Sequence, residues 1–392
     1  MVASAHPRSG DLAPQQSGPD GFSAFVPRPL PPEPPLQLTA ELQTTVDRAN
    51  QALGRLDGIT LLLPDPGVFL YSYVRKEAVL SSQIEGTQSS LSDLLLFEHD
   101  AAPGVPRGDV EEASNYVAAV YHGMDLIASG LPLSVRMLRE VHAVLMRGGR
   151  GGARQPGEFR HVQNWLGGPS PAMARFVPPP AQLVPDAMGA LERFVNDEPR
   201  PTPVLIKAAL AHAQFESIHP FLDGNGRVGR LLVTLLLVAD GVLRQPLLYL
   251  SLYLKRHRDD YYDHLQRTRT EGDWEGWLRF FLDGVTEVAT STTKTTTDLV
   301  ALVEQDRQRV QHLGRGSSTA GRVHDRLVRE IVGRPTDIAR ALGLSEPPVY
   351  QALSRLEELG IVREITGRQR GRVYAYDHYL ALLNADTTSA LT

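Results

Sequence analysis

The most informative residues of the chain lie in one short segment, 219–230, with the sequence HPFLDGNGRVGR. Within it a histidine, a carboxylate and two arginines surround a glycine-rich turn. Asp223 is a hard oxygen ligand of the kind that Mg²⁺ takes together with phosphate oxygens. His219 stands just before the turn, where a general base is needed. A base, a metal ligand and cations for phosphate together predict a site that handles a nucleotide.

A run of almost wholly apolar residues, 228–239, follows the turn and predicts a buried helix. The first N–H groups of a helix lack helical partners and the helix dipole favours negative charge there, so an anion is expected at this end. Gly224 and Gly226 let the backbone approach such a ligand closely. Arg227 and Arg230 lie on neighbouring faces of the first turn and can fork onto phosphate oxygens.

Two other interpretations of the glycines fit the sequence less well. The stretch 224–229 also satisfies G-x-G-x-x-G, the dinucleotide-binding fingerprint, but that motif should follow a buried strand. Here the preceding segment, 204–217, has a helical pattern, with Thr202 as N-cap and Pro203 as the first helical residue. A plain glycine turn between two core helices would leave the clustered acidic and basic side chains unexplained.

The segment 219–230 resembles the signature of the Fic family, H-P-F-x-D-G-N-G-R-x-x-R, at every defined position. Members of that family transfer AMP from ATP to a hydroxyl side chain of a target protein. The resemblance implies that His219 is the catalytic base, that Asp223 holds Mg²⁺, and that the partner is a protein with a Tyr, Thr or Ser hydroxyl. It also implies a set of ATP-binding residues, namely Glu85, Asp223, Gly224, Asn225, Gly226, Arg227, Arg230, Tyr261 and Tyr262.

A second motif covers residues 81–86, SSQIEG. Helical spacing places Ser81 and Glu85 on one face, and Gly86 can end the helix in a left-handed conformation. A glutamate in the last turn opposes the helix dipole, which an external cation would offset, although a solvated glutamate there is the commoner case. The motif resembles the inhibitory motif of the Fic family, [S/T]-x-x-x-E-[G/N]. This resemblance implies that Glu85 pairs with Arg230 and blocks the productive pose of ATP.

Periodicity and composition predict a mainly α-helical protein, and the resemblance implies a Fic-type helical bundle with a β-hairpin flap. Segments 162–166 and 175–177 can pair as that hairpin, and Arg175 and Phe176 then correspond to the flap that docks a target by strand addition. We expect five regions: a Pro-rich disordered or extended lead-in, 1–36; an N-terminal helical region with the inhibitory helix, 37–130; a Fic catalytic core, 131–290; a linker, 291–320; and a winged helix-turn-helix, 321–385.

The last of these regions has the order helix, tight turn, helix, strand, strand that is typical of a winged helix-turn-helix. Its recognition helix begins near Ser345, and Glu346 beside it is unfavourable near phosphates. Other side chains can offset this penalty at DNA, namely Tyr350, Gln351, Arg355, Arg368, Arg370 and Arg372. Contact with DNA and contact with another protein therefore both stay open.

Composition excludes several other classes of protein. The chain of 392 residues has no cysteine, which excludes disulfides and thiolate metal sites. Its net charge of −5 gives no general argument for nucleic acid or membrane binding. No apolar stretch is long enough to span a bilayer and no secretory signal is visible, so a cytoplasmic protein is expected.

Three functions are compatible with the sequence. The first is a self-inhibited AMP transferase. The second is a hydrolase that removes AMP from a modified protein, with Glu85 orienting the water. The third is a DNA-binding regulator with a nucleotide-sensing Fic domain. The sequence leaves the target protein and a homodimeric state open.

Overall fold

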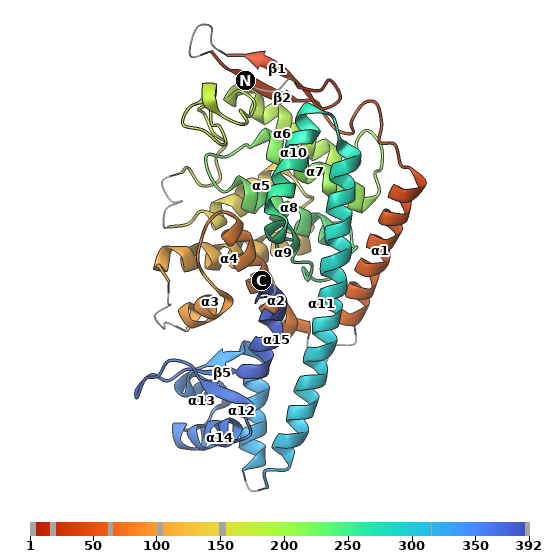
Figure 1. The fold of residues 1–392 in the computed structure, drawn as a ribbon. Coiled ribbons are helices and arrows are strands. Elements are labelled where there is room, and N and C mark those ends of the chain that lie inside the picture. The colour runs from red at the N-terminus through yellow and green to blue at the C-terminus, as the bar shows by residue number, and fades with distance from the viewer. Residues whose placement is uncertain are drawn as a thin grey trace.

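The computed structural model describes residues 5–15, 21–61, 66–99, 105–148, 154–314 and 316–388. Helices dominate this part of the chain and the strands are few and short, which confirms the prediction of a mainly α-helical protein (Figure 1). Within the same ranges, no helix combines the length and the apolar character that a membrane crossing requires.

The N-terminal region consists of a hairpin and four helices. In chain order these are β1 (Gly10–Pro14), β2 (Ser23–Pro27), α1 (Ala40–Thr60), α2 (Pro66–Ile84), α3 (Leu91–Glu98) and α4 (Arg107–Ala128). The side chain of Ser90 accepts a hydrogen bond from the backbone N–H of Asp93 and caps α3.

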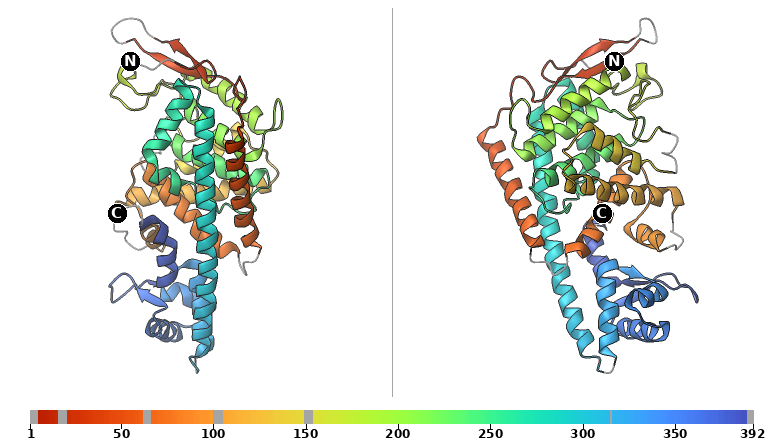
Figure 2. Two further views of the ribbon diagram at one scale, coloured as in Figure 1. Left: turned by 45° about the vertical axis from the view of Figure 1, so that its right-hand side comes forward. Right: turned by 180° about the vertical axis from the view of Figure 1, so that it is seen from behind.

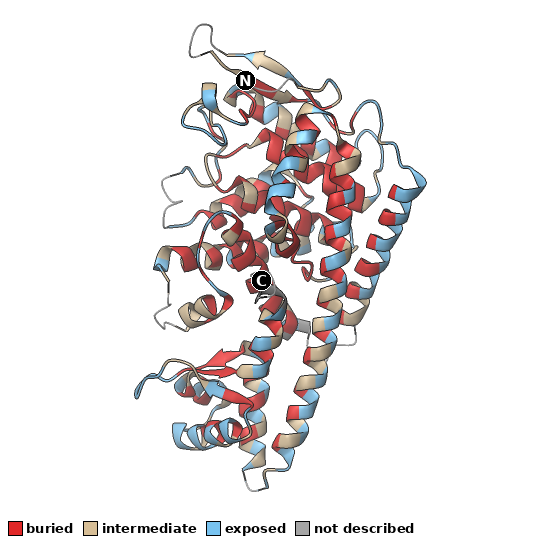
Figure 3. Ribbon diagram, viewed as in Figure 1, coloured by how far each residue is buried: buried red, intermediate tan, exposed pale blue. Residues whose placement is uncertain are grey.

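The central region contains α7, which ends directly before the signature segment, α8, which carries its second half, and the helices next to them in the chain. They are α5 (Val135–Leu145), α6 (Val184–Val195), α7 (Val204–Ile218), α8 (Asn225–Ala239), α9 (Ser251–Arg256) and α10 (Arg258–Thr270). Helices α7 and α8 are buried on nearly all sides, as Figure 3 shows. Helix α8 begins at Asn225, three residues before the apolar run, and the N-cap of α7 is Pro203 rather than Thr202.

The C-terminal region begins with one long helix, α11 (Trp274–Gln311), which lies beside α1 over much of its length (Figure 2). The region expected as a linker, 291–320, is helical up to Gln311, because α11 continues into it without a break. The threonines there support the helix: the Thr292 hydroxyl donates to the Val288 carbonyl at 2.7 Å. Thr292 and Thr296 are buried, so this polar segment belongs to the packed interior.

A small unit with the winged helix-turn-helix pattern follows α11. It contains α12 (Ser317–Glu330), β3 (Val332–Gly333), α13 (Pro335–Leu342), α14 (Glu346–Glu358), β4 (Val362–Glu364) and β5 (Tyr374–Tyr376). The strands form an antiparallel sheet in the order β3-β5-β4. The sequence did not indicate the terminal helix α15 (Asp377–Thr388), which packs against α11. The Tyr376 hydroxyl donates to the buried carboxylate of Asp306 on α11 at 2.8 Å, which fixes the unit to the long helix.

Of the two states expected for the lead-in, 1–36, its described residues adopt the extended one and not disorder. Strands β1 and β2 pair in antiparallel fashion, and Ala24 and Phe25 are buried. The Phe25 ring lies 5.9 Å from that of Phe176, and its backbone N–H donates to the Val177 carbonyl at 2.8 Å. Apolar contacts of this hairpin with the central region outweigh the effect of a proline-rich composition.

The predicted flap hairpin is reduced to a single antiparallel bridge between Leu166 and Phe176. The backbone N–H of each residue donates to the carbonyl of the other, at 2.9 and 3.1 Å. The chain between them forms a 3-10 turn, η2 (Pro171–Met173), and the glycines of the loop adopt positive φ angles. These turns leave no length for a longer ladder.

Candidate active site

His219 ends α7 in a left-handed conformation, with φ 49° and ψ 61°. This bend directs the chain out of the helix and into the loop. The buried Arg160 fixes the bend, because its Nε donates to the His219 carbonyl and its backbone N–H donates to the Pro220 carbonyl, both at 2.9 Å. Burial, together with the nearby charges of Arg269 and Arg160, lowers the pKa of His219 to about 3. The imidazole is therefore neutral near pH 7 and can accept a proton.

The loop after His219 requires a glycine at position 224. Gly224 has φ +76°, and a β-carbon there would lie 2.8 Å from the sulfur of Met146. Its backbone N–H donates to the Asp223 Oδ1 at 2.6 Å. The Asp223 side chain is 46% exposed, so a carboxylate oxygen can reach a ligand from solvent.

His142, on α5, packs against this loop and holds it in place. The sequence did not indicate this role. Its Nδ1 accepts a hydrogen bond from the Gly157 N–H at 2.8 Å, which leaves the proton on Nε2. Nε2 lies 3.1 Å from the Asp223 carbonyl oxygen and therefore donates to it. The ring stacks on Phe221 with 3.7 Å between centroids. Burial lowers the pKa of His142 to about 4, so this neutral form persists near pH 7.

Asn225 has a different place from the one expected. Its side-chain oxygen accepts from the Phe221 N–H at 2.8 Å, and its amide nitrogen donates to the Phe221 carbonyl at 2.9 Å. The side chain therefore braces the loop and does not line an anion site. Only its backbone N–H, in the first turn of α8, remains suited to an anion.

The pairing of Glu85 with Arg230 that the sequence led us to expect is present. Arg230 Nη2 donates to Glu85 Oε1 at 2.7 Å and to the Ser81 carbonyl at 2.9 Å, and Nε donates to Ser81 Oγ at 2.8 Å. Gly86, with φ +99°, ends the segment. Burial alone would raise the pKa of Glu85, but Arg230, with Arg227 and His219, holds this pKa below its usual range. Glu85 is therefore an anion near neutral pH.

Glu85 also lies directly over the first turn of α8. A β-carbon at Gly226 would be 2.2 Å from Glu85 Oε1 and 3.0 Å from a nitrogen of Arg230. Only glycine allows this approach. Arg227, one residue further on, is buried and donates through Nη1 to Glu112 Oε2 on α4 at 3.0 Å. The two arginines of the signature are thus held by carboxylates from two separate segments, the turn after α2 and helix α4.

The two tyrosines of α10 separate into different environments. Tyr261 is 1% exposed, and its hydroxyl lies 2.9 Å from His212 Nε2 in the core. Its expected contact with ATP is therefore wrong for this structure. Tyr262 is 36% exposed, with the guanidinium of Arg258 5.8 Å from its ring centroid, and it remains the candidate.

The two predicted flap residues, Arg175 and Phe176, also differ in their exposure. Phe176 is buried, and the Arg269 guanidinium stacks on its ring at 3.8 Å from the centroid, so it anchors the flap. Arg175 is exposed and forms an ion pair with Asp263 on α10. The outer surface of the flap is apolar and exposed at four residues: Val162, Trp165, Leu166 and Met173.

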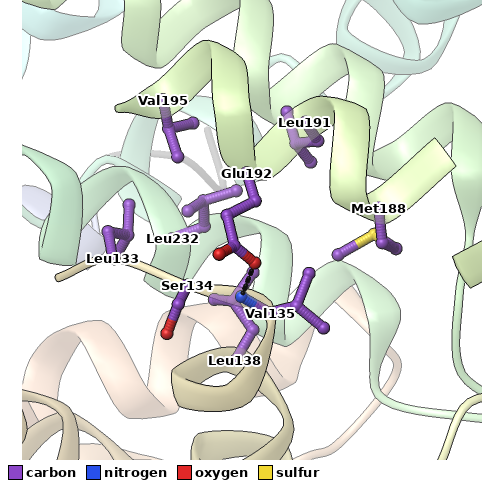
Figure 4. Close-up of a pocket in the computed structure, with 9 residues that line it drawn as sticks. All are labelled: Leu133, Ser134, Val135, Leu138, Met188, Leu191, Glu192, Val195 and Leu232. Atoms are coloured by element: carbon purple, nitrogen blue, oxygen red, sulfur yellow. Dashed lines mark hydrogen bonds between the residues drawn. The ribbon is translucent and has the colours of Figure 1, made fainter. Parts of the chain in front are cut away.

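Among the described residues no group of three or more His, Asp or Glu side chains could hold a metal ion alone. Asp223 beside a phosphate site still fits Mg²⁺, which commonly uses one or two carboxylates plus phosphate oxygens. A pocket between α5 and α6, drawn in Figure 4, is a different feature. Its lining is mostly apolar, and Glu192 there accepts the Val135 N–H at 2.8 Å to cap α5, so it has no part in the site.

Comparison with known proteins agrees with this geometry. The "Fic/DOC family N-terminal" model matches residues 43–125, the "Fic/DOC family" model matches 132–237, and the "Winged helix-turn-helix DNA-binding" model matches 335–363. A protein adenylyltransferase Fic from Drosophila yakuba is 31% identical over 258 residues, or 63% of this chain and 48% of the relative. The same-named protein from Culex quinquefasciatus is 32% identical over 204 residues, or 51% of this chain and 38% of the relative.

The chain therefore spans half or less of the length of these relatives. The crystal structure of a Fic family protein from Desulfovibrio desulfuricans shares the fold, with a TM-score of 0.58 and 22% identity over 87% of this chain and 97% of that one. Signature, fold and family models agree: the chain belongs to the Fic/DOC family, with a winged helix-turn-helix unit at its C-terminal end.

Proposed function

We propose that this protein transfers AMP from ATP to a Tyr, Thr or Ser hydroxyl of a target protein, and that Glu85 restrains the reaction. One observation carries the proposal: the Glu85 carboxylate occupies Arg230 above the N-terminus of α8, where the signature would bind phosphate. A carboxylate on that arginine is an internal competitor for a phosphate group. The names of the curated relatives, protein adenylyltransferase, support the same activity.

The reaction uses the neutral imidazole of His219. Nδ1 is buried, so Nε2 is the nitrogen left for the target hydroxyl. That hydroxyl gives its proton to Nε2 while its oxygen attacks the α-phosphorus of ATP. The bond from the α-phosphorus to the bridging oxygen breaks and pyrophosphate leaves with the electron pair. Positioned base catalysis of this kind contributes about 10²–10⁴-fold.

Charge stabilisation supplies the remainder. The first turn of α8 offers backbone N–H groups to the phosphates, and Arg227 and Arg230 add positive charge. Mg²⁺ bound by Asp223 would neutralise further phosphate charge. Tyr262, the exposed tyrosine of α10, would border the adenine.

The target segment would dock on the flap. The bridge at Leu166 and Phe176 positions an extended backbone whose outer surface is apolar. Such a surface suits strand addition, in which backbone hydrogen bonds give affinity and side-chain contacts give specificity. The buried Arg160 connects this flap to the base, because it donates both to the Val162 carbonyl and to the His219 carbonyl.

Removal of AMP from a modified protein is the alternative at the same site, with Glu85 as the group that orients water. The Glu85 side chain is 35% exposed, so a water can reach its carboxylate, as this alternative requires. Release of AMP from a modified target by the unaltered protein, lost in Glu85→Gly, would identify this reaction.

The winged helix-turn-helix unit would contact duplex DNA. The wing arginines, Arg368, Arg370 and Arg372, are exposed, and so are Tyr350 and Gln351 of α14. Basic side chains of this kind bind phosphates and make binding depend on salt. Retardation of duplex DNA that weakens with salt supports this partner, and binding independent of salt would favour a protein instead.

The decisive experiment compares the unaltered protein, Glu85→Gly and His219→Ala with α-labelled ATP and Mg²⁺. We expect label on protein to rise in the Glu85 variant and to be absent in the His219 variant. Label retained by His219→Ala would refute the assignment of the base. Equal label in the unaltered protein and Glu85→Gly would refute the restraint.

A further inference from the structure

We propose that Glu112, on α4, is a positioning residue for nucleotide transfer: it holds the Arg227 guanidinium in the orientation that meets phosphate and keeps it away from Asp223. The inference rests on the proposed function of the same site. It begins from the 3.0 Å contact between Arg227 Nη1 and Glu112 Oε2, which joins α8 to a helix outside the signature segment.

In the described ranges, Glu112 lies nearer to the Arg227 guanidinium than Asp223 does, at 3.0 Å against 3.6 Å. Arg227 is 5% exposed and Glu112 is 18% exposed at the side chain, so water competes little for the contact. Two other groups lie near Arg227 Nη2 but are farther away than Glu112 is from Nη1. Met146 Sδ is at 3.8 Å and Asp223 Oδ1 is at 3.6 Å. Nε is buried and has no hydrogen-bond partner within those ranges. The guanidinium is thus fixed at one nitrogen and keeps further donors for an anion.

Binding of ATP therefore requires a different change at each of the two signature arginines. Both acceptors of Arg230 Nη2 come from Ser81 and Glu85, so a phosphate has to displace the Glu85 carboxylate. The Arg227 contact involves Nη1 alone and can persist while Nη2 and Nε face a phosphate. Glu112 therefore orients Arg227 for a phosphate, whereas Glu85 takes the donor of Arg230 that a phosphate would use.

Removal of the Glu112 charge has a second consequence at Asp223. A buried guanidinium needs an anionic partner, and Asp223 is already 3.6 Å away, one helical turn before Arg227. Without Glu112 the guanidinium would move onto Asp223, and the carboxylate suited to Mg²⁺ would be engaged. Loss of Glu112 should thus weaken binding of both ATP and the metal, beyond any effect on folding.

The test uses Glu112→Gln in a protein that also carries Glu85→Gly, and the matched control is Glu111→Gln. Glu111 is the adjacent residue on α4 and pairs at 3.0 Å with Arg107, a surface side chain that is 77% exposed. We expect the KM for ATP and the half-saturating Mg²⁺ concentration to rise about 10- to 100-fold in Glu112→Gln, with a smaller change in kcat. Glu112→Asp, which keeps the charge, should recover part of the loss, and Glu111→Gln should match its parent.

A binding measurement separates this proposal from the proposed function. Calorimetric titration of ATP, with and without Mg²⁺, into the same variants carrying His219→Ala reads affinity without turnover. Weaker ATP binding in Glu112→Gln supports the positioning role even if no protein is ever labelled, in which case AMP transfer alone fails. A lower melting temperature with unchanged ATP affinity and unchanged Mg²⁺ dependence would overturn the proposal, as would a parent protein that binds no ATP.

Discussion

Replacement of Glu85 by glycine should activate the protein by an amount that the structure bounds. The substitution removes one charge-assisted hydrogen bond of 2.7 Å, while both contacts of Arg230 with Ser81 remain. Such a bond contributes about 1.5–3 kcal/mol. In the proposed competition of ATP with Glu85 for one guanidinium, this free energy reappears in productive ATP binding. Transfer at subsaturating ATP should therefore rise about 10- to 150-fold.

The same substitution should destabilise the protein without nucleotide. The Arg230 side chain is 2% exposed, and loss of its carboxylate leaves a buried charge with fewer partners. We expect a loss of about 1–3 kcal/mol in the free energy of unfolding and a lower melting temperature. ATP would then restore the missing anion, so its stabilising effect should be larger in Glu85→Gly than in the unaltered protein.

The assay pairs label transfer from α-labelled ATP with melting curves at several ATP concentrations. The matched control is Glu98→Gly. Glu98 pairs with Arg75 of the same helix α2 at 2.7 Å in a comparably buried setting, but away from the site. That control should lose stability without gaining activity. Activation of both variants would show that loosening of α2 causes the effect. A Glu85→Gly protein that binds ATP but is not activated would refute the reasoning.

Three further predictions concern other parts of the molecule. Ser81→Ala should raise transfer only about two- to tenfold, since it removes one neutral acceptor, the Ser81 hydroxyl, from Arg230 and leaves Glu85 in place; activation equal to that of Glu85→Gly in the same assay would contradict this. Burial raises the pKa of Glu216 to about 7, above its value in an unfolded chain, so ionisation costs stability as pH rises from about 4.5 through 7. Glu216→Gln should therefore increase the melting temperature by several degrees at about pH 8 and have little effect at about pH 4.5, and an equal shift at both values in calorimetry would refute the buried ionisation. Replacement of the three wing arginines by serine should lower the slope of log affinity for DNA against log salt by about 3, and an unchanged slope in retardation assays would exclude the wing.

Sequence reasoning could reach the part of the candidate site whose residues are neighbours in the sequence. The signature segment spans one loop and one helical turn, so spacing alone indicated an anion site near Asp223 and Arg230. Glu85 is 145 positions away from Arg230, and no local pattern connects them. Only the family resemblance of the Ser81 segment suggested the pairing, and the fold supplies the 2.7 Å contact.

The order found at the edges of the fold has a common physical cause. A proline-rich composition left the region before residue 37 open between disorder and extended chain, and the region from residue 291 was expected as a linker. Both segments are ordered because apolar side chains within them reach the core: Phe25 is 4% exposed and Leu299 is fully buried. Composition measures the average preference of a segment, whereas a few buried contacts decide its structure.

The supports of the site could not be predicted for a different reason. His142, Arg160 and Glu112 lie in ordinary helical or loop sequence, and each acts through a contact with the signature segment that folding creates. A histidine on a helix face or an arginine in a loop is usually a surface residue. Here Arg160 is 1% exposed and satisfies the carbonyl of His219. Burial of such a charge is costly unless several acceptors meet it, so the constraint lies in the fold around the loop and not in the residues beside it in the sequence.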